Sequence, residues 1–311
     1  NAHAAMTLEG NYVDVGVSDY GTLGSDDSNS PGLIYDPSGT QNFFPGGISN
    51  DFLTPGDPHD GFSFTANQLG GYIANDNDGQ QGSIGSFTTT SGPVATTVAG
   101  YSLAATWSGS YTTSGGATIT VTNTEYFNPN SQQINIQTTL STTSNLTGVV
   151  FTRSLDPDPD VNLYNQFSTK NALGNAAYGA DANSAACGSG ADTDQTVCLV
   201  TSNTQGAVTH IANIDAACCT DEDPNSYLAN GTGFMPGAGT YSDDSINLTF
   251  DIGDLTVDDP LTIDYAYVLG ATFSQVSNPT APISVPEPAS LVVFGSGLVG
   301  LALQRRRRRQ S

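Results

Sequence analysis

Basic residues are almost missing from this chain of 311 residues. Seven lysines and arginines stand against 30 acidic residues, and five of the seven are consecutive at Arg305–Arg309. Residues 1–284 hold two bases, Arg153 and Lys170, and 29 acids, which leaves them with a net charge of −27. A body of this charge repels phosphate backbones and anionic head groups. The composition therefore excludes nucleic acid and an anionic lipid surface as direct electrostatic partners.

Glutamate is scarce as well, because the chain has 26 aspartates but four glutamates. Aspartate favours turns and caps, whereas glutamate favours helices, and long helical patterns are missing from the sequence. Thirty-five glycines point the same way, and 13 tyrosines, 13 phenylalanines and a hydrophobic content of 37% suffice for a β core. The composition predicts a loop-rich β protein and not a disordered chain.

The common catalytic motifs are also missing. The chain has no phosphate-binding loop, no G-x-S-x-G elbow and no H-E-x-x-H pair, and this favours a non-catalytic protein. His59 has acidic neighbours at Asp57 and Asp60, but a single histidine on a loop is expected to be structural. Because so acidic a chain offers many carboxylates, a glycoside hydrolase-like, carbohydrate-active enzyme that uses an aspartate pair is the alternative.

Alternating apolar residues predict antiparallel strands through much of the chain. In residues 133–140 the apolar residues share one face and polar residues take the other, which is typical of a sheet with one wet face. Residues 180–240 are polar and rich in loop residues, and are expected to hold few strands. Strands are expected at 11–17, 33–35, 60–64 with Phe62 and Phe64 on one face, 101–107, 117–122, 133–140, 148–153, 246–252 and 261–269.

These strands define the predicted fold class, an all-β protein whose residues 6–275 form an antiparallel β-sandwich. One large sandwich of the galactose-mutarotase-like kind would take strands from both halves of the chain, and two smaller sandwiches split near residue 95 are the alternative. Residues 276–284 form a proline-containing linker. Residues 1–5 include Ala-His-Ala, the small-residue pattern that ends a secretory signal peptide, and are interpreted as its remnant.

Three aspartates alternate with two prolines at Asp156, Asp158 and Asp160. In an extended backbone alternate residues share a side, so the three carboxylates would line one edge and repel each other. Three interpretations follow. Arg153 neutralises them in an ion-pair cluster, or they bind Ca²⁺ together with backbone carbonyls, or the segment is a solvated loop. Calcium is the cofactor that this segment suggests.

Four cysteines, Cys187, Cys198, Cys218 and Cys219, are expected to form disulfides if the protein is exported. Adjacent cysteines rarely bond each other. Two bridges that join Cys187 and Cys198 to the adjacent pair are therefore expected, and a Cys187–Cys198 bridge is the alternative. A metal site is the competing interpretation, although paired C-x-x-C spacing is missing.

The C-terminal tail, residues 285–311, has three parts in a fixed order. Val285, Pro286, Glu287 and Pro288 form a stiff, extended motif, because proline fixes the backbone on both sides of the glutamate. The next 15 residues, 289–303, are uncharged and apolar, which predicts one short transmembrane helix of about 22 Å. The arginines that follow, Arg305, Arg306, Arg307, Arg308 and Arg309, act as a cytoplasmic stop by the positive-inside rule.

This tail resembles the PEP-CTERM sorting signal, with Pro286-Glu287-Pro288 as the signature tripeptide followed by the apolar segment and the arginine cluster. The resemblance covers residues 284–311 only. It implies recognition by an exosortase, a membrane-embedded, transpeptidase-like cysteine protease. The exosortase would remove the tail and release or attach the body at the outer envelope of a Gram-negative bacterium that makes exopolysaccharide.

The resemblance leads to a functional expectation for the whole chain. The protein is expected to be an exported, non-catalytic cell-surface or extracellular-matrix protein. Its expected partners are the exosortase, the inner membrane during processing, and exopolysaccharide.

Overall fold

The computed structural model describes residues 6–24, 31–53, 59–79, 81–174, 182–201, 208–219 and 222–276. The chain divides into two compact units, residues 1–279 and 280–311, and all described residues belong to the first. The signal-peptide remnant, the linker beyond Val276 and the whole sorting tail, including its predicted transmembrane helix, lie outside the described residues. Within the described ranges, no helix is long and apolar enough to cross a membrane.

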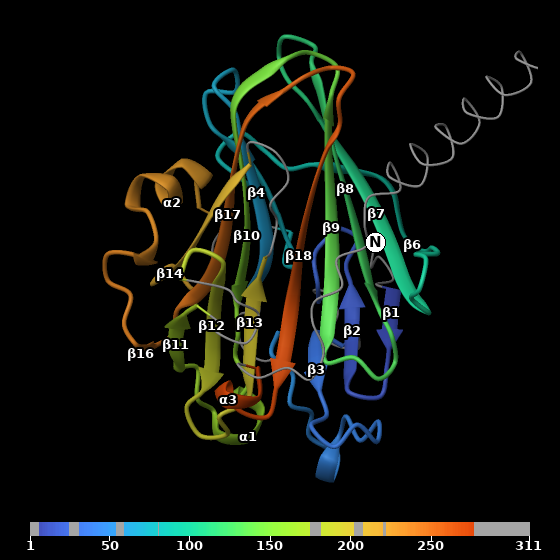
Figure 1. The fold of residues 1–311 in the computed structure, drawn as a ribbon, viewed down its shortest axis with the longest axis vertical. Coiled ribbons are helices and arrows are strands. Elements are labelled where there is room, and N and C mark those ends of the chain that lie inside the picture. The colour runs from blue at the N-terminus through green and yellow to red at the C-terminus, as the bar shows by residue number, and fades with distance from the viewer. Residues whose placement is uncertain are drawn as a thin grey trace, which may run out of the picture. The chain divides into compact units, whose positions relative to one another are not determined.

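The described strands form three sheets (Figure 1). A small sheet holds β1 (Met6–Glu9), β2 (Val13–Val17) and β3 (Leu33–Tyr35). A six-stranded sheet has the order β15 (Gly233–Phe234), β14 (Thr209–Asp215), β17 (Ser245–Leu255), β10 (Leu146–Asp156), β4 (His59–Thr65) and β5 (Tyr72–Asp76).

A nine-stranded sheet is the largest. Its order is β16 (Tyr241–Ser242), β11 (Thr169–Leu173), β12 (Ala185–Gly190), β13 (Thr196–Val200), β18 (Leu261–Gly270), β9 (Gln133–Thr142), β8 (Thr118–Phe127), β7 (Leu103–Thr112) and β6 (Thr88–Ala95). Helices are short: α1 (Val161–Tyr164), α2 (Pro224–Asn230), α3 (Phe273–Val276) and a 3-10 turn, η1 (Pro45–Gly47).

The mostly-β, antiparallel character predicted from alternation is confirmed for the described residues. Strand pairs in the two large sheets are antiparallel except β14 with β15, which is parallel. The predicted strands at 101–107 and 117–122 are longer than expected, because β7 and β8 pair in register from Leu103–Phe127 to Thr112–Thr118. The polar threonines and serines of these strands hid their true extent.

Residues 180–240 contain more strand than expected. β12, with the sequence Ala-Ala-Cys-Gly-Ser-Gly, and β13 are buried over their whole length inside the nine-stranded sheet. Small side chains let such a strand pack on both faces without an alternating pattern. The expectation of a mostly loop-forming segment was therefore wrong at these positions.

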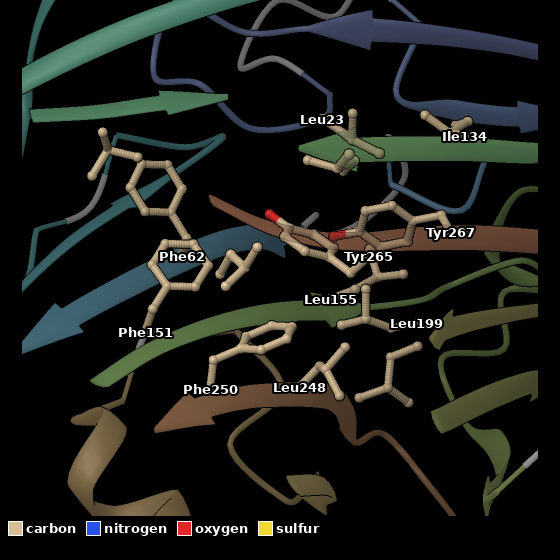
Figure 2. Close-up of a cluster of buried hydrophobic side chains, with 14 of the residues drawn as sticks. Leu23, Phe62, Ile134, Phe151, Leu155, Leu199, Leu248, Phe250, Tyr265 and Tyr267 are labelled. Carbon is tan, nitrogen blue, oxygen red and sulfur yellow. The ribbon is translucent and has the colours of Figure 1, made fainter. Parts of the chain in front are cut away.

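The main core lies between the two large sheets (Figure 2). Phe62, Phe151 and Phe250 come from the six-stranded sheet and meet Tyr265 and other buried residues of the nine-stranded sheet. The ring centroids of Phe62 and Phe151 are 5.8 Å apart, as are those of Phe250 and Tyr265. Aromatic contacts at these distances stabilise a core beyond the area they bury.

Both halves of the chain contribute to the same sheets. β4 and β5 precede residue 95, yet β4 pairs with β10, and β10 pairs with β17. The described strands therefore do not divide into two sandwiches at that residue. Long-range pairing of this kind brings charged residues that are far apart in sequence onto one inner face.

Candidate functional site

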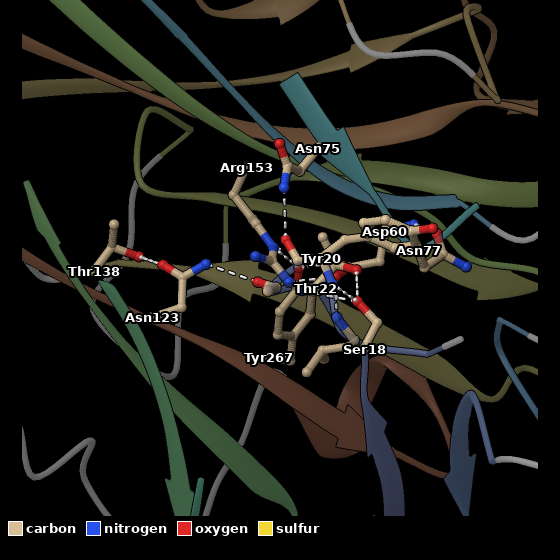
Figure 3. Close-up of polar contacts among 12 residues, drawn as sticks. Ser18, Tyr20, Thr22, Asp60, Asn75, Asn77, Asn123, Thr138, Arg153 and Tyr267 are labelled. Carbon is tan, nitrogen blue, oxygen red and sulfur yellow. Dashed lines mark hydrogen bonds and ion pairs between the residues drawn. The ribbon is translucent and has the colours of Figure 1, made fainter. Parts of the chain in front are cut away.

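An ion pair whose two side chains are fully buried lies between the large sheets (Figure 3). Arg153 on β10 and Asp60 on β4 form an ion pair, and neither side chain is exposed. The strand register explains the pairing, since Phe62 lies opposite Arg153 and Asp60 is two residues away on the same face of β4. Nε of Arg153 donates to Oδ1 of Asp60 at 3.3 Å, and Nη2 donates to Oδ2.

Two further donors complete the environment of the Asp60 carboxylate. The hydroxyl of Tyr267 donates to Oδ1 and accepts a hydrogen bond from Nε of Arg153 at 2.8 Å. The backbone N–H of Leu23 donates to Oδ2 at 2.5 Å. Burial is the largest single influence on the pKa of Arg153 and lowers it, but the Asp60 carboxylate together with Tyr267 and Tyr265 outweighs burial and raises that pKa well above its usual range. The guanidinium therefore stays charged.

Glu125 on β8 is completely buried in the same core, where the charges of Arg153 and Asp60 act on it. Among the described residues, neither of its carboxyl oxygens has a hydrogen-bond partner, and Nη1 of Arg153 has none either. Burial raises the pKa of Glu125 to about 8, more than the attraction of Arg153 lowers it. At neutral pH this group is therefore mostly protonated.

A separate series of hydrogen bonds joins the loop before Leu23 to the nine-stranded sheet. Nδ2 of Asn123 donates to the carbonyl of Gly21 at 2.7 Å, and the hydroxyl of Thr138 donates to Oδ1 of Asn123 at 2.7 Å. Gly21 has φ +80°, and a Cβ there would stand 2.3 Å from the ring of Trp107. The loop passes too close to the indole ring for a side chain.

The buried polar residues join strands and loops of the core to one another. Their acidic and basic members come from β4, β8 and β10 and are all fully buried, so a dissolved substrate does not reach them in this conformation. His59 is likewise buried, with Nδ1 3.8 Å from Oδ2 of Asp76, and burial lowers its pKa to about 4. His59 is thus an uncharged core residue at the start of β4 and not the loop residue that was expected, and its structural role stays a prediction.

The three alternating aspartates are not held together as a set. Asp156 and Asp158 are buried and lie with Asp243 so that one carboxylate oxygen from each is within 4.8 Å of the others. Asp160 instead accepts hydrogen bonds from the backbone N–H groups of Asp192 and Thr193, at 2.7 and 3.2 Å.

The chain geometry separates Asp160 from the other two aspartates. β10 ends at Asp156 and α1 begins at Val161, so the extended alternation does not continue to Asp160.

The proposed ion pair between Arg153 and this segment was wrong. Arg153 and Asp156 are three residues apart on β10, and an odd separation places side chains on opposite faces of a strand. Arg153 therefore points into the core toward Asp60, away from the carboxylate of Asp156. Lys170, the other basic residue before the C-terminal tail, forms an ion pair with Asp194 at 2.7 Å on the protein surface.

Asp243 is the member of the acidic group that sequence reasoning missed. It precedes β17 by two residues, and β17 pairs with β10, which brings it beside Asp156. Oxygen atoms within 4.8 Å of one another suit a cation that takes ligands at about 2.4 Å, as Ca²⁺ does. The calcium site was predicted at Asp156, Asp158 and Asp160, and a site in which Asp243 takes the place of Asp160 is a new proposal.

The two bridges expected between Cys187, Cys198 and the adjacent pair are not found; the alternative Cys187–Cys198 bridge is confirmed, and the expectation that adjacent cysteines do not bond each other was wrong. Cys187 and Cys198 are opposite each other on β12 and β13 and are bonded, with a Cα–Cα distance of 4.0 Å. Cys218 and Cys219 are bonded to each other. Because the cross-strand register brings the first two together, the adjacent pair is left to close on itself. Sγ of Cys219 lies 3.7 Å from Oδ2 of Asp156.

The described body is a mostly-β protein whose buried ion pair joins β4 to β10 within the six-stranded sheet and contacts the nine-stranded sheet through the hydroxyl of Tyr267. Residues 284–308 match the PEP-CTERM protein-sorting motif, so the chain carries the PEP-CTERM signal that its tail resembled. That motif supports an exported protein sorted by an exosortase to the envelope or surface of a Gram-negative bacterium. No protein of curated function matches the chain in sequence.

Several solved structures are similar over most of the chain. A GalM/aldose epimerase homologue from C. elegans matches with 9% identity and a TM-score of 0.41, over 86% of this chain and 100% of that one. An alpha-mannosidase from Enterococcus faecalis V583 matches with 8% identity and a TM-score of 0.40, over 85% and 29%. A GH36 alpha-galactosidase from Geobacillus stearothermophilus matches with 10% identity and a TM-score of 0.36, over 87% and 41%. This chain spans less than half the length of the last two, and likeness at this level carries no argument about activity.

Proposed function

We propose that this protein is a non-catalytic component of the cell surface or extracellular matrix, delivered there by exosortase processing. The observation that carries the proposal is the match of residues 284–308 to the sorting motif. The body supports it, because the buried ion pair of Arg153 with Asp60 is enclosed between the sheets and joins β10 to β4. A net charge of −27 also keeps such a body soluble outside the cell.

Each part of the tail has a role in this proposal. Prolines on both sides of Glu287 favour an extended backbone at Val285–Pro288, which would suit an enzyme groove that binds an extended chain. Residues 289–303 enter the inner membrane as a short helix, and Arg305–Arg309 remain on the cytoplasmic side. Cleavage near Pro286 then frees the acidic body from its membrane segment.

Association with exopolysaccharide is the finer part of the proposal. The described surface carries exposed aromatic side chains that can stack on sugar rings, including Phe44, Tyr164 and Tyr241. A calcium ion at Asp156, Asp158 and Asp243 is the cofactor that we propose with it. Retention of the purified body on polysaccharide from the native host, with bovine serum albumin as an acidic control, tests the association.

The competing proposal is a glycoside hydrolase-like enzyme that uses an aspartate pair. The observation that bears on it is the approach of Asp156, Asp158 and Asp243, whose oxygens lie within 4.8 Å of one another, because retaining glycosidases use two carboxyl groups about 5 Å apart. Release of reducing sugar from host polysaccharide by the wild type, and its loss in Asp156→Asn, would establish the enzyme and displace the non-catalytic proposal.

The deciding experiment is the intact mass of the mature protein from the envelope and the medium of the native host. We expect a mass that lacks everything after the Pro286 region, with or without an adduct. A variant with Pro286-Glu287-Pro288 replaced by three alanines should keep its full tail. A wild-type protein that keeps all five terminal arginines would instead define a tail-anchored membrane protein, and the matrix assignment would be wrong.

A further inference from the structure

We propose that Asp156, Cys218 and Cys219 form a redox-controlled metal site, which binds a thiophilic divalent cation such as Zn²⁺ or Cd²⁺ once the Cys218–Cys219 disulfide is reduced. The three side chains offer ligand atoms that lie within 4.8 Å of one another. Thiolates and carboxylates are both zinc ligands, and zinc sites with three protein ligands leave the fourth position to water. The inference does not depend on exosortase sorting, although the site shares Asp156 with the proposed calcium site.

The strand register brings these residues together. Ile246 of β17 lies opposite Leu155 of β10 on one side and opposite Ile214 of β14 on the other. β10 therefore ends, at Asp156, level with the end of β14, at Asp215. The turn that follows β14 carries the two cysteines back over this end of the sheet, toward Asp156.

The carboxylate already stands at a ligand distance from the sulfur. In a tetrahedral zinc site with Zn–S of about 2.3 Å and Zn–O of about 2.0 Å, a sulfur and an oxygen are about 3.5 Å apart. Sγ of Cys219 is 3.7 Å from Oδ2 of Asp156. Asp156 is nearly fully buried and belongs to a paired strand, so its position does not depend on the cysteine turn.

The turn itself is ordered by local hydrogen bonds. The N–H of Ala217 donates to Oδ1 of Asp215 at 3.1 Å, and the N–H of Cys218 donates to the carbonyl of Ala216 at 3.0 Å. Neither contact uses a sulfur atom. Breaking the disulfide therefore leaves the backbone contacts that hold both cysteines near Asp156.

The two disulfides differ in their accessibility to a reductant. Cys218 and Cys219 are partly exposed on a turn, whereas Cys187 and Cys198 are completely buried in the interior of the nine-stranded sheet. An attacking thiol or phosphine must reach a sulfur in line with the S–S bond, so access decides which bridge reacts in the folded protein. The Cys218–Cys219 bridge is thus the reducible one, and the Cys187–Cys198 bridge is an internal control.

The chemistry balances with an external reductant. A tertiary phosphine attacks one sulfur, the S–S bond accepts two electrons, and water supplies the oxygen of the phosphine oxide and the protons of two thiols. A dithiol accomplishes the same reduction by exchange and becomes a disulfide itself. The cation then replaces the two thiol protons, which pass to solvent, so binding releases two protons per ion. The acidic body attracts cations to this surface.

The test uses the full chain, treated with a water-soluble phosphine and desalted without oxygen. Peptide mapping of alkylated thiols should place two thiols at Cys218 and Cys219 and none at Cys187 or Cys198. Titration with Cd²⁺ should give an ultraviolet thiolate-to-metal band that saturates at one ion per chain. The unreduced chain should show no such band.

Two matched variants separate the site from general acidity. Asp156→Asn removes a ligand and should weaken Cd²⁺ binding by about tenfold or more in the reduced chain. Asp158→Asn removes a buried carboxylate of the same surface that is not in this ligand set, and should leave the affinity of the thiolate site unchanged. Both variants keep the cysteines and the disulfide, so their folding can be compared directly by circular dichroism.

Several results would overturn the proposal. These are a reduced chain with two free thiols and no thiolate–metal band, equal weakening by Asp156→Asn and Asp158→Asn, and a first reduction at Cys187–Cys198. Resistance of the Cys218–Cys219 bridge to the phosphine in the folded chain would count against it equally.

Discussion

Arg153 and Asp60 depend on each other, because each is a fully buried charge whose solvation is supplied mainly by the other. Removing one partner of such a pair leaves an uncompensated charge, which typically costs about 3–5 kcal/mol. We expect Arg153→Met to lower the free energy of unfolding by that amount in chemical denaturation.

The double variant Arg153→Met with Asp60→Leu should recover much of this loss, because no charge is then left alone. Lys170→Met is the matched surface control. Lys170 pairs with Asp194 where both side chains are about half exposed, so its loss should change stability by less than about 1 kcal/mol. Equal losses in the buried and surface variants would contradict a structural role for the interior pair.

Glu125 makes the stability of the protein depend on pH in a defined direction. Its pKa is about 8 in the folded chain against 4.5 ordinarily, so between these values the folded state keeps a proton that the unfolded state has lost. The stability that this proton contributes is complete below about pH 4.5 and is lost as the pH rises through 8. Glu125→Gln removes this dependence.

The test compares the free energies of unfolding of the two proteins from pH 5 to 9. The wild type should lose stability relative to Glu125→Gln as the pH rises, at up to about 1.4 kcal/mol per pH unit. Asp14, whose pKa burial raises to about 6, is present in both proteins, so its contribution cancels. A constant difference across this range would show that Glu125 is ionised in the folded state.

At the scale of strands, the disulfides differ in what they can stabilise. The Cys187–Cys198 bridge joins β12 to β13 across a sequence separation of 11, and the chain-entropy model gives a loop of that size about 3 kcal/mol. The Cys218–Cys219 bridge has a separation of one and closes almost no loop. We expect Cys187→Val with Cys198→Val to lower the free energy of unfolding by about 3 kcal/mol.

The matched control is Cys218→Ser with Cys219→Ser, which should cost less than about 1 kcal/mol because the unfolded chain gains little freedom. Both pairs of substitutions are compared by urea denaturation under non-reducing conditions. A larger loss from the adjacent pair would mean that the turn after β14 supports the fold more than its exposure implies.

The strands were predictable wherever a pattern of period two was visible. β18 kept its alternation, with Ile263, Tyr265 and Tyr267 facing the core as expected. The same alternation also places Arg153 on the core face of β10, because Arg153 shares a face with Phe151 and Leu155. What parity could not give is the partner, since Asp60 is 93 residues away and only the sheet order brings it to Arg153.

The acidic group was predictable in part for a related reason. Asp156 and Asp158 were identified from their spacing, but Asp243 joins them only through the pairing of β17 with β10. Asp160 does not join this group because β10 ends at Asp156, four residues earlier. Local spacing thus predicted a group of carboxylates at this surface, whereas the pairing of distant strands determines which aspartates belong to the group.

At the scale of the whole molecule, the charge of −27 on residues 1–284 predicts a general response to salt and a specific response to calcium. Screening reduces the repulsion among the acids, so added NaCl should raise the melting temperature. At the same ionic strength, CaCl₂ should raise it further, since an ion bound by Asp156, Asp158 and Asp243 stabilises the folded state by about 2.7 kcal/mol at 100 times its Kd. Asp158→Asn should keep the NaCl effect and lose the additional calcium effect in scanning calorimetry. Equal melting temperatures in NaCl and CaCl₂ at matched ionic strength would show that calcium acts by screening alone, and the calcium site would be wrong.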